Sequence, residues 1–277
     1  MKFLSDRRFL WASAAVLLLL TVAAGAEFLA PYDPDLQAFV PLDPPSWAHM
    51  AGTDRFGRDL FSRILVGLQT SVLSTLVLVV AVTSIGTATG VLCGYRGGVL
   101  DAILMRVSDV VLAFPGLVFA LAVAAVLGGG LQNAVLALAF IGWPKYARIA
   151  RSLTLAVRGS AFVDAAKLAG SSDARILVRH VLPNALGPVF VTAVLDIGTM
   201  LMELAGLSFL GLGARPPTAE LGNMMSAGRS MLQSSPWVVL APGAAILLAV
   251  AIFNFFGDAL RDALDPSTRA RVEEYSK

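Results

Sequence analysis

Two carboxylates stand out because they interrupt a long apolar run. Asp196 and Glu203 lie within residues 186–212, which are otherwise largely apolar. An ionisable group inside a membrane-length run is expensive, so it usually faces a cavity or the interior of a helix bundle. A separation of seven residues places both carboxylates on one helix face, about 20° apart. The pair could therefore line a passage and meet a cationic group, such as a peptide amine or a metal chelate.

A purely structural explanation of the pair stays open. Hydrogen bonds between helices could neutralise both carboxylates, with Asn254 or a serine as the partner. Asn254 interrupts a second apolar run, at residues 238–257, and is the weaker candidate for contact with a substrate. Asp196, Glu203 and Asn254 are therefore the candidate substrate-pathway residues.

The chain has none of the common patterns for covalent chemistry. It contains no G-x-x-x-x-G-K-[ST] phosphate loop, no G-x-S-x-G elbow, no H-E-x-x-H and no C-x-x-C. His49 and His180 are expected on opposite faces of a membrane, so they cannot share a metal, and each is interpreted as a surface or capping residue. The sequence predicts no catalytic residue, no metal site and no cofactor bound by this chain. A membrane-embedded enzyme is disfavoured for the same reason.

The composition is that of a polytopic membrane protein. The chain has 277 residues, of which 57% are hydrophobic and 14% charged, and its mean hydropathy is +0.75. Soluble domains have about a quarter of their residues charged. The single cysteine, Cys93, excludes an intramolecular disulfide framework. No tract suggests a separate soluble domain or a nucleic-acid partner, so the lipid bilayer is the expected surrounding.

Apolar runs predict an all-α fold with six transmembrane helices. They cover residues 9–30, 71–95, 102–127, 131–149, 186–212 and 238–257. The first run is long enough to span a membrane and is interpreted as uncleaved, although Ala24-Gly25-Ala26 resembles a signal-peptidase site. Gly86, Gly90 and Gly94 would allow close helix approach in the second run. Phe114-Pro115-Gly116 should kink the third.

Residues 31–70 are expected to form an external loop that includes an amphipathic helix. The segment begins with a Pro- and Asp-rich strip and continues with G-T-D-R-F-G-R-D. From Asp59 onward, apolar residues recur at helical spacing, with Arg58 and Arg63 off that stripe. The pattern favours a helix that lies in the membrane interface ahead of the next span.

A polar island between the fourth and fifth runs predicts two short helices joined at a glycine. Asp164-Ala165-Ala166 opens the first helix, and Gly170 is placed to end it in a left-handed conformation. Ser171, Ser172 and Asp173 are good N-caps for the second helix. Pro183 and Pro188 should break whatever follows. Such a rigid projection suits docking into a soluble partner, although a simple connecting loop would fit the spacing too.

This island resembles the E-A-A-x3-G-x9-I-x-L-P loop of bacterial ABC importer permeases. Asp164, Ala165, Ala166, Gly170, Leu182 and Pro183 fall in register with it, while aspartate replaces the usual glutamate and His180 the commoner isoleucine. The segments G-T-D-R-F-G-R-D, L-S-F-L-G-L-G and F-N-F-F-G-D-A-L-R-D-A-L-D-P are similar to the C-type permeases of dipeptide, oligopeptide and nickel importers. Leu195-Asp196-Ile197-Gly198 and Pro217-Thr218-Ala219-Glu220 look more like the nickel or metal-chelate members.

Basic residues predict the orientation. Of the 21 Lys and Arg, only five fall on the face opposite the termini: Arg55, Arg58, Arg63, Arg215 and Arg229. Because Lys and Arg are enriched in cytoplasmic loops, both termini and the polar island are expected in the cytoplasm.

The resemblance implies a three-part organisation. Residues 1–30 would be an N-terminal tail and first transmembrane helix, 31–70 the external loop, and 71–277 the ABC permease core with a coupling loop at 159–185. The implied partners in the bacterial inner membrane are a homologous second permease, two ATP-binding subunits and an external solute-binding protein. ATP and Mg would then be bound by the partner subunits.

The implied function is translocation of small peptides or nickel chelates, driven by ATP hydrolysis on separate chains. The alternative, argued from the residues alone, is an ATP-independent channel or secondary transporter that uses Asp196 and Glu203 as a proton or cation relay.

Overall fold

Helices make up nearly all the regular structure of the computed structural model, which describes residues 7–264. Within that range no strand forms, and a single isolated bridge joins Thr53 to Asp59. The chain divides into two compact units. The first contains residues up to Leu76, Ala124–Ala134 and residues from Val194 onward, and the second contains Val77–Val123 and Val135–Ala193.

Five long helices provide the framework. They are α1 (Arg7–Ala24), α3 (Leu60–Arg96), α6 (Leu131–Arg158), α9 (Leu182–Phe209) and α11 (Trp237–Leu264). The shorter elements are α2 (Ala26–Leu29), α4 (Gly98–Leu112), α5 (Gly116–Val126), α7 (Ala161–Leu168), α8 (Asp173–Ile176), the π-helical turn η2 (Leu177–Val181), α10 (Leu221–Gly228) and the 3-10 turn η3 (Arg229–Met231).

The number of membrane spans differs from the predicted six. Within residues 7–264, four helical stretches are long and apolar enough to cross a membrane: Arg7–Ala24, Leu60–Arg96, Asp173–Phe209 and Trp237–Leu264. The pair α4 and α5 could form a fifth, broken span, since a 97° bend separates them. This bend lies at the predicted Phe114-Pro115-Gly116 kink. Helix α6 is too polar to qualify, because Gln132 and Asn133 open it and basic residues occupy its second half. The six-span count is therefore not confirmed.

The sequence predicted a separate amphipathic helix in the membrane interface before the second span, and no such separate helix forms within residues 7–264. Residues from Leu60 onward are the first turns of α3, which continues without a break to Arg96. Side chains on all sides of these turns are buried, including the polar Ser62 and Arg63 as well as Leu60 and Leu65. Alternating polar and apolar side chains produced an amphipathic pattern, but the polar side is covered by protein.

Pro183 and Pro188 do not end the helix that begins at Asp173. Helix α8, η2 and α9 follow one another without a gap from Asp173 to Phe209, with Pro188 inside α9. The π-helical turn η2 comes directly before Leu182-Pro183, and such turns relax the backbone where the regular hydrogen-bond ladder is interrupted. Proline is tolerated in membrane-length helices when local adjustments of this kind satisfy the backbone. The prediction of a break at Pro183 and Pro188 is therefore wrong.

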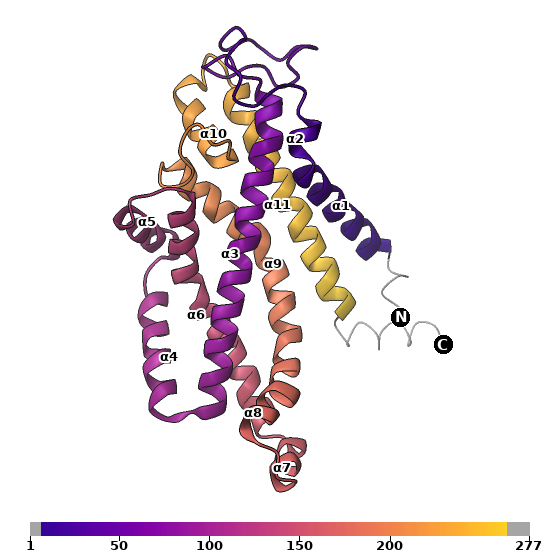
Figure 1. The fold of residues 1–277 in the computed structure, drawn as a ribbon, viewed down its shortest axis with the longest axis vertical. Helices are drawn as coiled ribbons and strands as arrows, with labels where there is room; N and C mark the ends of the chain where they lie inside the picture. Colours follow the sequence, from indigo (N-terminus) through magenta and orange to yellow (C-terminus); the bar gives the residue numbers. More distant parts are fainter. Residues whose placement is uncertain (1–6, 265–277) are drawn as a thin grey trace. The chain divides into compact units, whose positions relative to one another are not determined.

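In the first unit, α11 is the central packing element. Helices α1 and α10 both contact it, and Figure 1 shows α1 running beside it. Helix α9 approaches α11 closely through two glycines. A Cβ added at Gly257 would lie 2.8 Å from Leu195, and one at Gly198 would lie 2.3 Å from the Asn254 side-chain oxygen.

In the second unit, α3 and α6 pack backbone to backbone. The predicted small face at Gly86, Gly90 and Gly94 lies against successive turns of α6. A Cβ at Gly90 would be only 2.2 Å from the carbonyl oxygen of Ala147. Helix α4 is joined to α6 by ion pairs, between Asp101 and Arg151 at 2.5 Å and between Asp109 and Arg148 at 2.5 Å.

Candidate coupling loop and transport-pathway residues

The polar island contains a helix, a glycine turn and the start of a second helix, as the sequence predicts, with two differences. Helix α7 begins at Ala161, three residues before Asp164, and the second helix is not short, because α8 continues through η2 into α9. Asp164, Ala165 and Ala166 lie in α7, and Gly170 follows it with a left-handed φ of 79°. The Gly170 N–H donates to the Lys167 carbonyl at 2.9 Å, and the Ser171 N–H donates to the Ala166 carbonyl at 3.0 Å. These two bonds define a Schellman motif, which satisfies carbonyls left open at a helix end.

The second helix of the island has the expected N-cap. Ser172 has an extended backbone, and its hydroxyl accepts from the Arg175 N–H at 3.4 Å. Asp173 is then the first residue of α8. We use the name coupling loop for residues 159–185, which contain α7, the Gly170 turn, α8, η2 and the Leu182-Pro183 pair. Figure 1 shows α7 at one end of the second unit.

The coupling loop is anchored by a few apolar side chains and is otherwise exposed. Val163, Ile176 and Val181 are buried, which fixes the two helices on the unit that carries them. Leu168 is 91% exposed and Phe162 is 49% exposed, although both are large and apolar. The loop thus combines a fixed base with an uncovered apolar outer surface.

The candidate pathway residues lie in two helices of the first unit. Asp196 and Glu203 are partly buried residues of α9, so their seven-residue spacing does place them on one helix face. Asn254 lies in α11 and contacts α9 at Gly198. Because Gly198 is at least about 140° around the helix from Asp196 and Glu203, Asn254 meets a different face of α9.

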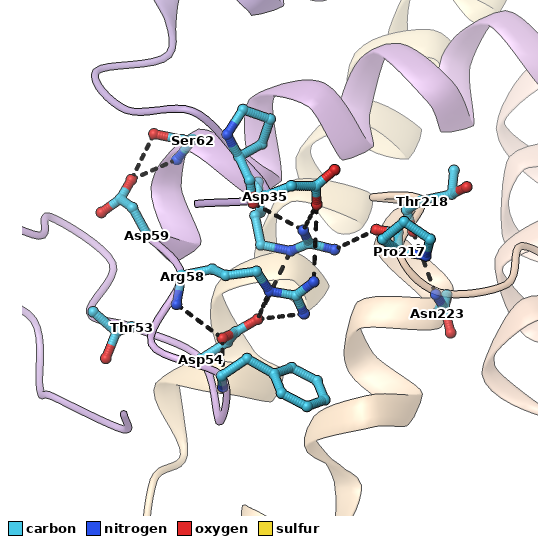
Figure 2. Close-up of polar contacts among 12 residues, drawn as sticks. Asp35, Thr53, Asp54, Arg58, Asp59, Ser62, Pro217, Thr218 and Asn223 are labelled. Atoms are coloured by element: carbon cyan, nitrogen blue, oxygen red, sulfur yellow. Dashed lines mark hydrogen bonds and ion pairs between the residues drawn. The ribbon is translucent and has the colours of Figure 1, made fainter. Parts of the chain in front are cut away.

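A cluster of four charged residues lies at the N-terminal end of α3. No sequence pattern indicated that these residues would meet. This Arg63 cluster consists of Asp35, Asp54, Arg58 and Arg63, and Figure 2 shows its contacts. The Asp54 carboxylate accepts from Arg58 Nε at 2.7 Å. Arg63 forms an ion pair with Asp35 at 2.6 Å and donates to the carbonyls of Pro34 at 2.9 Å and Pro217 at 3.1 Å.

The Arg63 cluster explains the G-T-D-R-F-G-R-D segment in structural terms. Gly52 and Gly57 have φ values of 78° and 69°, and a Cβ at Gly57 would lie 2.1 Å from the Phe39 carbonyl oxygen. The two glycines form the turns that place Asp54 and Arg58 against Arg63. Arg63 is 3% exposed, so it fastens the start of α3 to the loop before it and to the segment before α10.

His49 is not a surface residue, and this prediction is wrong. It is buried, and its Nδ1 lies 2.8 Å from Asp59 Oδ1. The other Asp59 oxygen accepts from the Ser62 hydroxyl at 2.7 Å. Asp59 therefore lies between the histidine and the serine, an order unsuited to nucleophilic catalysis, in which histidine must be the middle residue. Through residues 7–264, no group of three or more His, Cys, Asp or Glu is placed to hold a metal.

Glu220 is a buried, hydrogen-bonded carboxylate that the sequence analysis named only as the last residue of the phrase Pro217-Thr218-Ala219-Glu220. It is fully buried at the N-cap of α10, where its carboxylate accepts from the N–H groups of Gly222 at 3.0 Å and Asn223 at 2.8 Å. The Ser71 hydroxyl donates to the same carboxylate at 3.1 Å. Burial raises the pKa of Glu220, while the two backbone hydrogen bonds act in the opposite direction.

These features define a helical membrane protein in which the described charged clusters anchor helices and loops, and in which residues 159–185 form an exposed projection. Residues 86–270 match the family described as "Binding-protein-dependent transport system inner membrane component". The chain belongs to this family of ABC importer permeases.

Curated relatives are similar over most of their length. The chain is 46% identical over 252 residues to the probable D,D-dipeptide transport system permease protein DdpC of Escherichia coli K12, covering 91% of this chain and 85% of that one. It is 44% identical over 229 residues to the dipeptide transport system permease protein DppC of Alkalihalophilus pseudofirmus, covering 83% and 75%. For the glutathione transport system permease protein GsiD of Pectobacterium atrosepticum, the identity is 41% over 273 residues, covering 97% and 90%.

Solved structures support the fold. A chain of the MetNI methionine ABC transporter, in an inward-facing conformation, is similar with a TM-score of 0.58 at 19% sequence identity. The similarity covers 73% of this chain and 97% of that chain. The all-α membrane fold predicted from the sequence is confirmed, as is the resemblance to peptide permeases.

Proposed function

We propose that this chain is the permease subunit of an importer for small peptides, driven by ATP hydrolysis on two partner subunits. The second permease, the external solute-binding protein and the bacterial inner membrane complete the proposed assembly. Both termini and the coupling loop would face the cytoplasm. ATP and Mg would be bound by the ATPase subunits, and this chain would do no covalent chemistry.

The observation that carries this proposal is the geometry of the coupling loop within the family match. Helix α7, the Schellman turn at Gly170 and α8 form a projection with a buried base and an uncovered apolar surface. An exposed Leu168 in a loop too polar for lipid favours contact with another protein. A docked ATPase could then shift the populations of inward-open and outward-open packings by moving this loop.

Small peptides are favoured over nickel chelates as the substrate. The relatives named above are permeases of dipeptide, D,D-dipeptide and glutathione transport systems. Asp196 and Glu203 are proposed to line the pathway and to meet the amino group of a peptide. The resemblance of Leu195-Asp196-Ile197-Gly198 and Pro217-Thr218-Ala219-Glu220 to nickel or metal-chelate members covers only two short phrases, whereas the similarity to these relatives covers most of the chain. The proton-relay alternative is not favoured, because family membership implies an ATP-driven complex.

A substrate experiment tests the first part of the proposal. The complex, purified through a tag on this chain, is reconstituted with its binding protein in vesicles, and uptake of a labelled dipeptide is measured. We expect uptake to need ATP, and unlabelled dipeptide or glutathione to compete while a nickel chelate does not. ATP-independent uptake driven by a pH gradient would instead support the relay, and accumulation of nickel chelate alone would overturn the peptide assignment.

A loop experiment tests the second part. Gly170→Pro cannot adopt the left-handed φ that ends α7, so the coupling loop should lose its shape while the long helices keep theirs. We expect little transport at normal complex abundance. Normal substrate-stimulated ATPase activity and uptake in this variant would exclude a coupling role for the loop.

A further inference from the structure

The C-terminal end of α3 contacts the chain on both sides of α7. Tyr95, the second-last residue of α3, donates its hydroxyl to Asp173 Oδ1 at 2.6 Å. Asp173 is the first residue of α8, after α7. The Arg158 guanidinium, at the end of α6 and before α7, lies 6.0 Å from the centre of the Tyr95 ring. Tyr95 therefore hydrogen-bonds to Asp173 inside the coupling loop and lies beside Arg158, the residue just before the loop.

On the α6 side, this connection is reinforced by backbone packing. The Arg158 guanidinium also lies 3.5 Å from the Gly94 carbonyl, at a helix C-terminus where a cation is favourable. Gly86, Gly90 and Gly94 press α3 against α6 over more than two turns. Close packing of this kind resists deformation, so α3 and α6 should move together.

Tyr95 is connected to α8 by a single hydrogen bond to Asp173, in contrast to the backbone packing between α3 and α6. A phenol hydroxyl that donates to a carboxylate at 2.6 Å makes a short, charge-assisted bond. Asp173 is exposed, so water competes for it and the bond can break and re-form at modest cost. Such a contact can position α8 without locking it permanently.

We propose that Tyr95 is a positioning residue that links α8, within the coupling loop, to the packed pair of helices α3 and α6. Movement imposed on the loop then reaches α3, in addition to the helices that flank the loop in sequence. This inference rests on the proposed coupling function of residues 159–185. It assigns to Tyr95 a part in transmission that neither its sequence position nor the loop motif indicates.

Three variants separate the hydrogen bond from general effects on the loop. Tyr95→Phe removes the donor and keeps the ring beside Arg158, Asp173→Ala removes the acceptor, and Asp173→Asn keeps an acceptor oxygen and the helix-start preference. The measurement is substrate transported per ATP hydrolysed by the reconstituted complex. We expect this ratio to fall about three- to tenfold in Tyr95→Phe and Asp173→Ala, and by less than about twofold in Asp173→Asn. The double variant Tyr95→Phe/Asp173→Ala should be no worse than either single variant.

Two controls make the outcomes distinguishable. Tyr32→Phe removes a hydroxyl that donates to the Ala48 carbonyl at 3.2 Å, outside the coupling loop, and should leave the ratio of substrate transported to ATP hydrolysed unchanged.

Gly170→Pro reports on the coupling loop itself. If Gly170→Pro uncouples and Tyr95→Phe does not, the role of Tyr95 is refuted and the proposed function stands. If neither uncouples, the coupling role of the loop fails as well. An Asp173→Asn variant as impaired as Asp173→Ala would also overturn the inference, because an acceptor oxygen for the Tyr95 hydroxyl would then make no difference.

Discussion

At the scale of single residues, Glu220 illustrates how burial changes an ionisable group. Its carboxylate accepts three hydrogen bonds, from Ser71 and from the N–H groups of Gly222 and Asn223, yet no part of the residue is exposed to solvent. Removing the charged form from water costs more than these bonds return, and the pKa of Glu220 is raised above 4.5. The stability that Glu220 contributes at the start of α10 therefore depends on pH.

The sign of this linkage gives the first prediction. A carboxyl whose folded pKa is raised contributes stability that is fully present below its unfolded pKa, and this stability is lost as pH rises through the folded pKa. We expect the thermal midpoint of the purified complex to increase, from this group, as pH falls from neutral toward 4.5. Glu220→Gln should remove that contribution. Thermal unfolding of both proteins from pH 5 to pH 8 measures it, and identical pH slopes would contradict the prediction.

Asp196 and Glu203 give a second prediction at the same scale. If the pair meets a cationic group of the substrate, Asp196→Asn and Glu203→Gln should each lower uptake about three- to tenfold, because amide replacement keeps size and removes charge. The defect should be strongest for the more cationic peptides, and the double variant should lose less than the sum of the single losses. Wild-type uptake by the double variant, at equal complex abundance, would exclude a charged pathway lining.

At the scale of elements, the close contact between α3 and α6 depends on the absence of side chains. A Cβ at Gly90 would overlap the Ala147 carbonyl, whereas a Cβ at Gly187, inside α9, would meet no atom within 4 Å. Two chemically identical substitutions therefore have opposite expected effects.

This contrast gives the third prediction. Gly90→Ala should destabilise the second unit by about 1–3 kcal/mol, because the helices must separate or shift. Gly187→Ala should be neutral or stabilising by up to about 1 kcal/mol, since alanine lowers the entropy that glycine loses in a helix. Denaturation midpoints of the two variants in the same detergent provide the comparison. Equal stability of both variants would mean that α3 and α6 are not packed through this face.

Sequence patterns predicted those elements that local chemistry determines. The helix–glycine–helix island followed from Gly170 and the Ser172 cap, and the break near Pro115 followed from the proline. The errors arose where distant segments decide the outcome. Arg58 and Arg63 appeared to be the polar side of an interface helix, because their partner Asp35 and the Pro217 carbonyl lie far away in the sequence. Likewise, no local pattern indicates that Tyr95 reaches Asp173.

At the scale of the whole molecule, orientation is the main remaining prediction. The distribution of Lys and Arg predicts that the coupling loop and both termini face the cytoplasm, and residues 1–6 and 265–277 lie outside the described residues. The only native cysteine, Cys93, is buried. A Cys93→Ser background therefore allows single cysteines to be introduced as reporters.

The fourth prediction uses such reporters. A cysteine at exposed Ser172 should react with a membrane-impermeant thiol reagent only after the cells are opened. A cysteine at exposed Trp47, in the 31–59 segment, should react in intact cells. Labelling at position 172 from outside would reverse the orientation, and with it the side on which the ATPases could dock.

Arg63 also bears on the order in which the protein is made. Its hydrogen-bond partner Pro217 is encoded 154 residues later, and ribosomes add about 5–20 residues per second. The Arg63 side chain must therefore wait roughly 8 to 30 s after synthesis before its last partner exists. The middle of the chain, which supplies the second unit, is complete by then. During that interval Arg63 has only its nearer partners, among them Asp35 and the Pro34 carbonyl, so the link between the start of α3 and the segment before α10 can form only after residue 217 has been made.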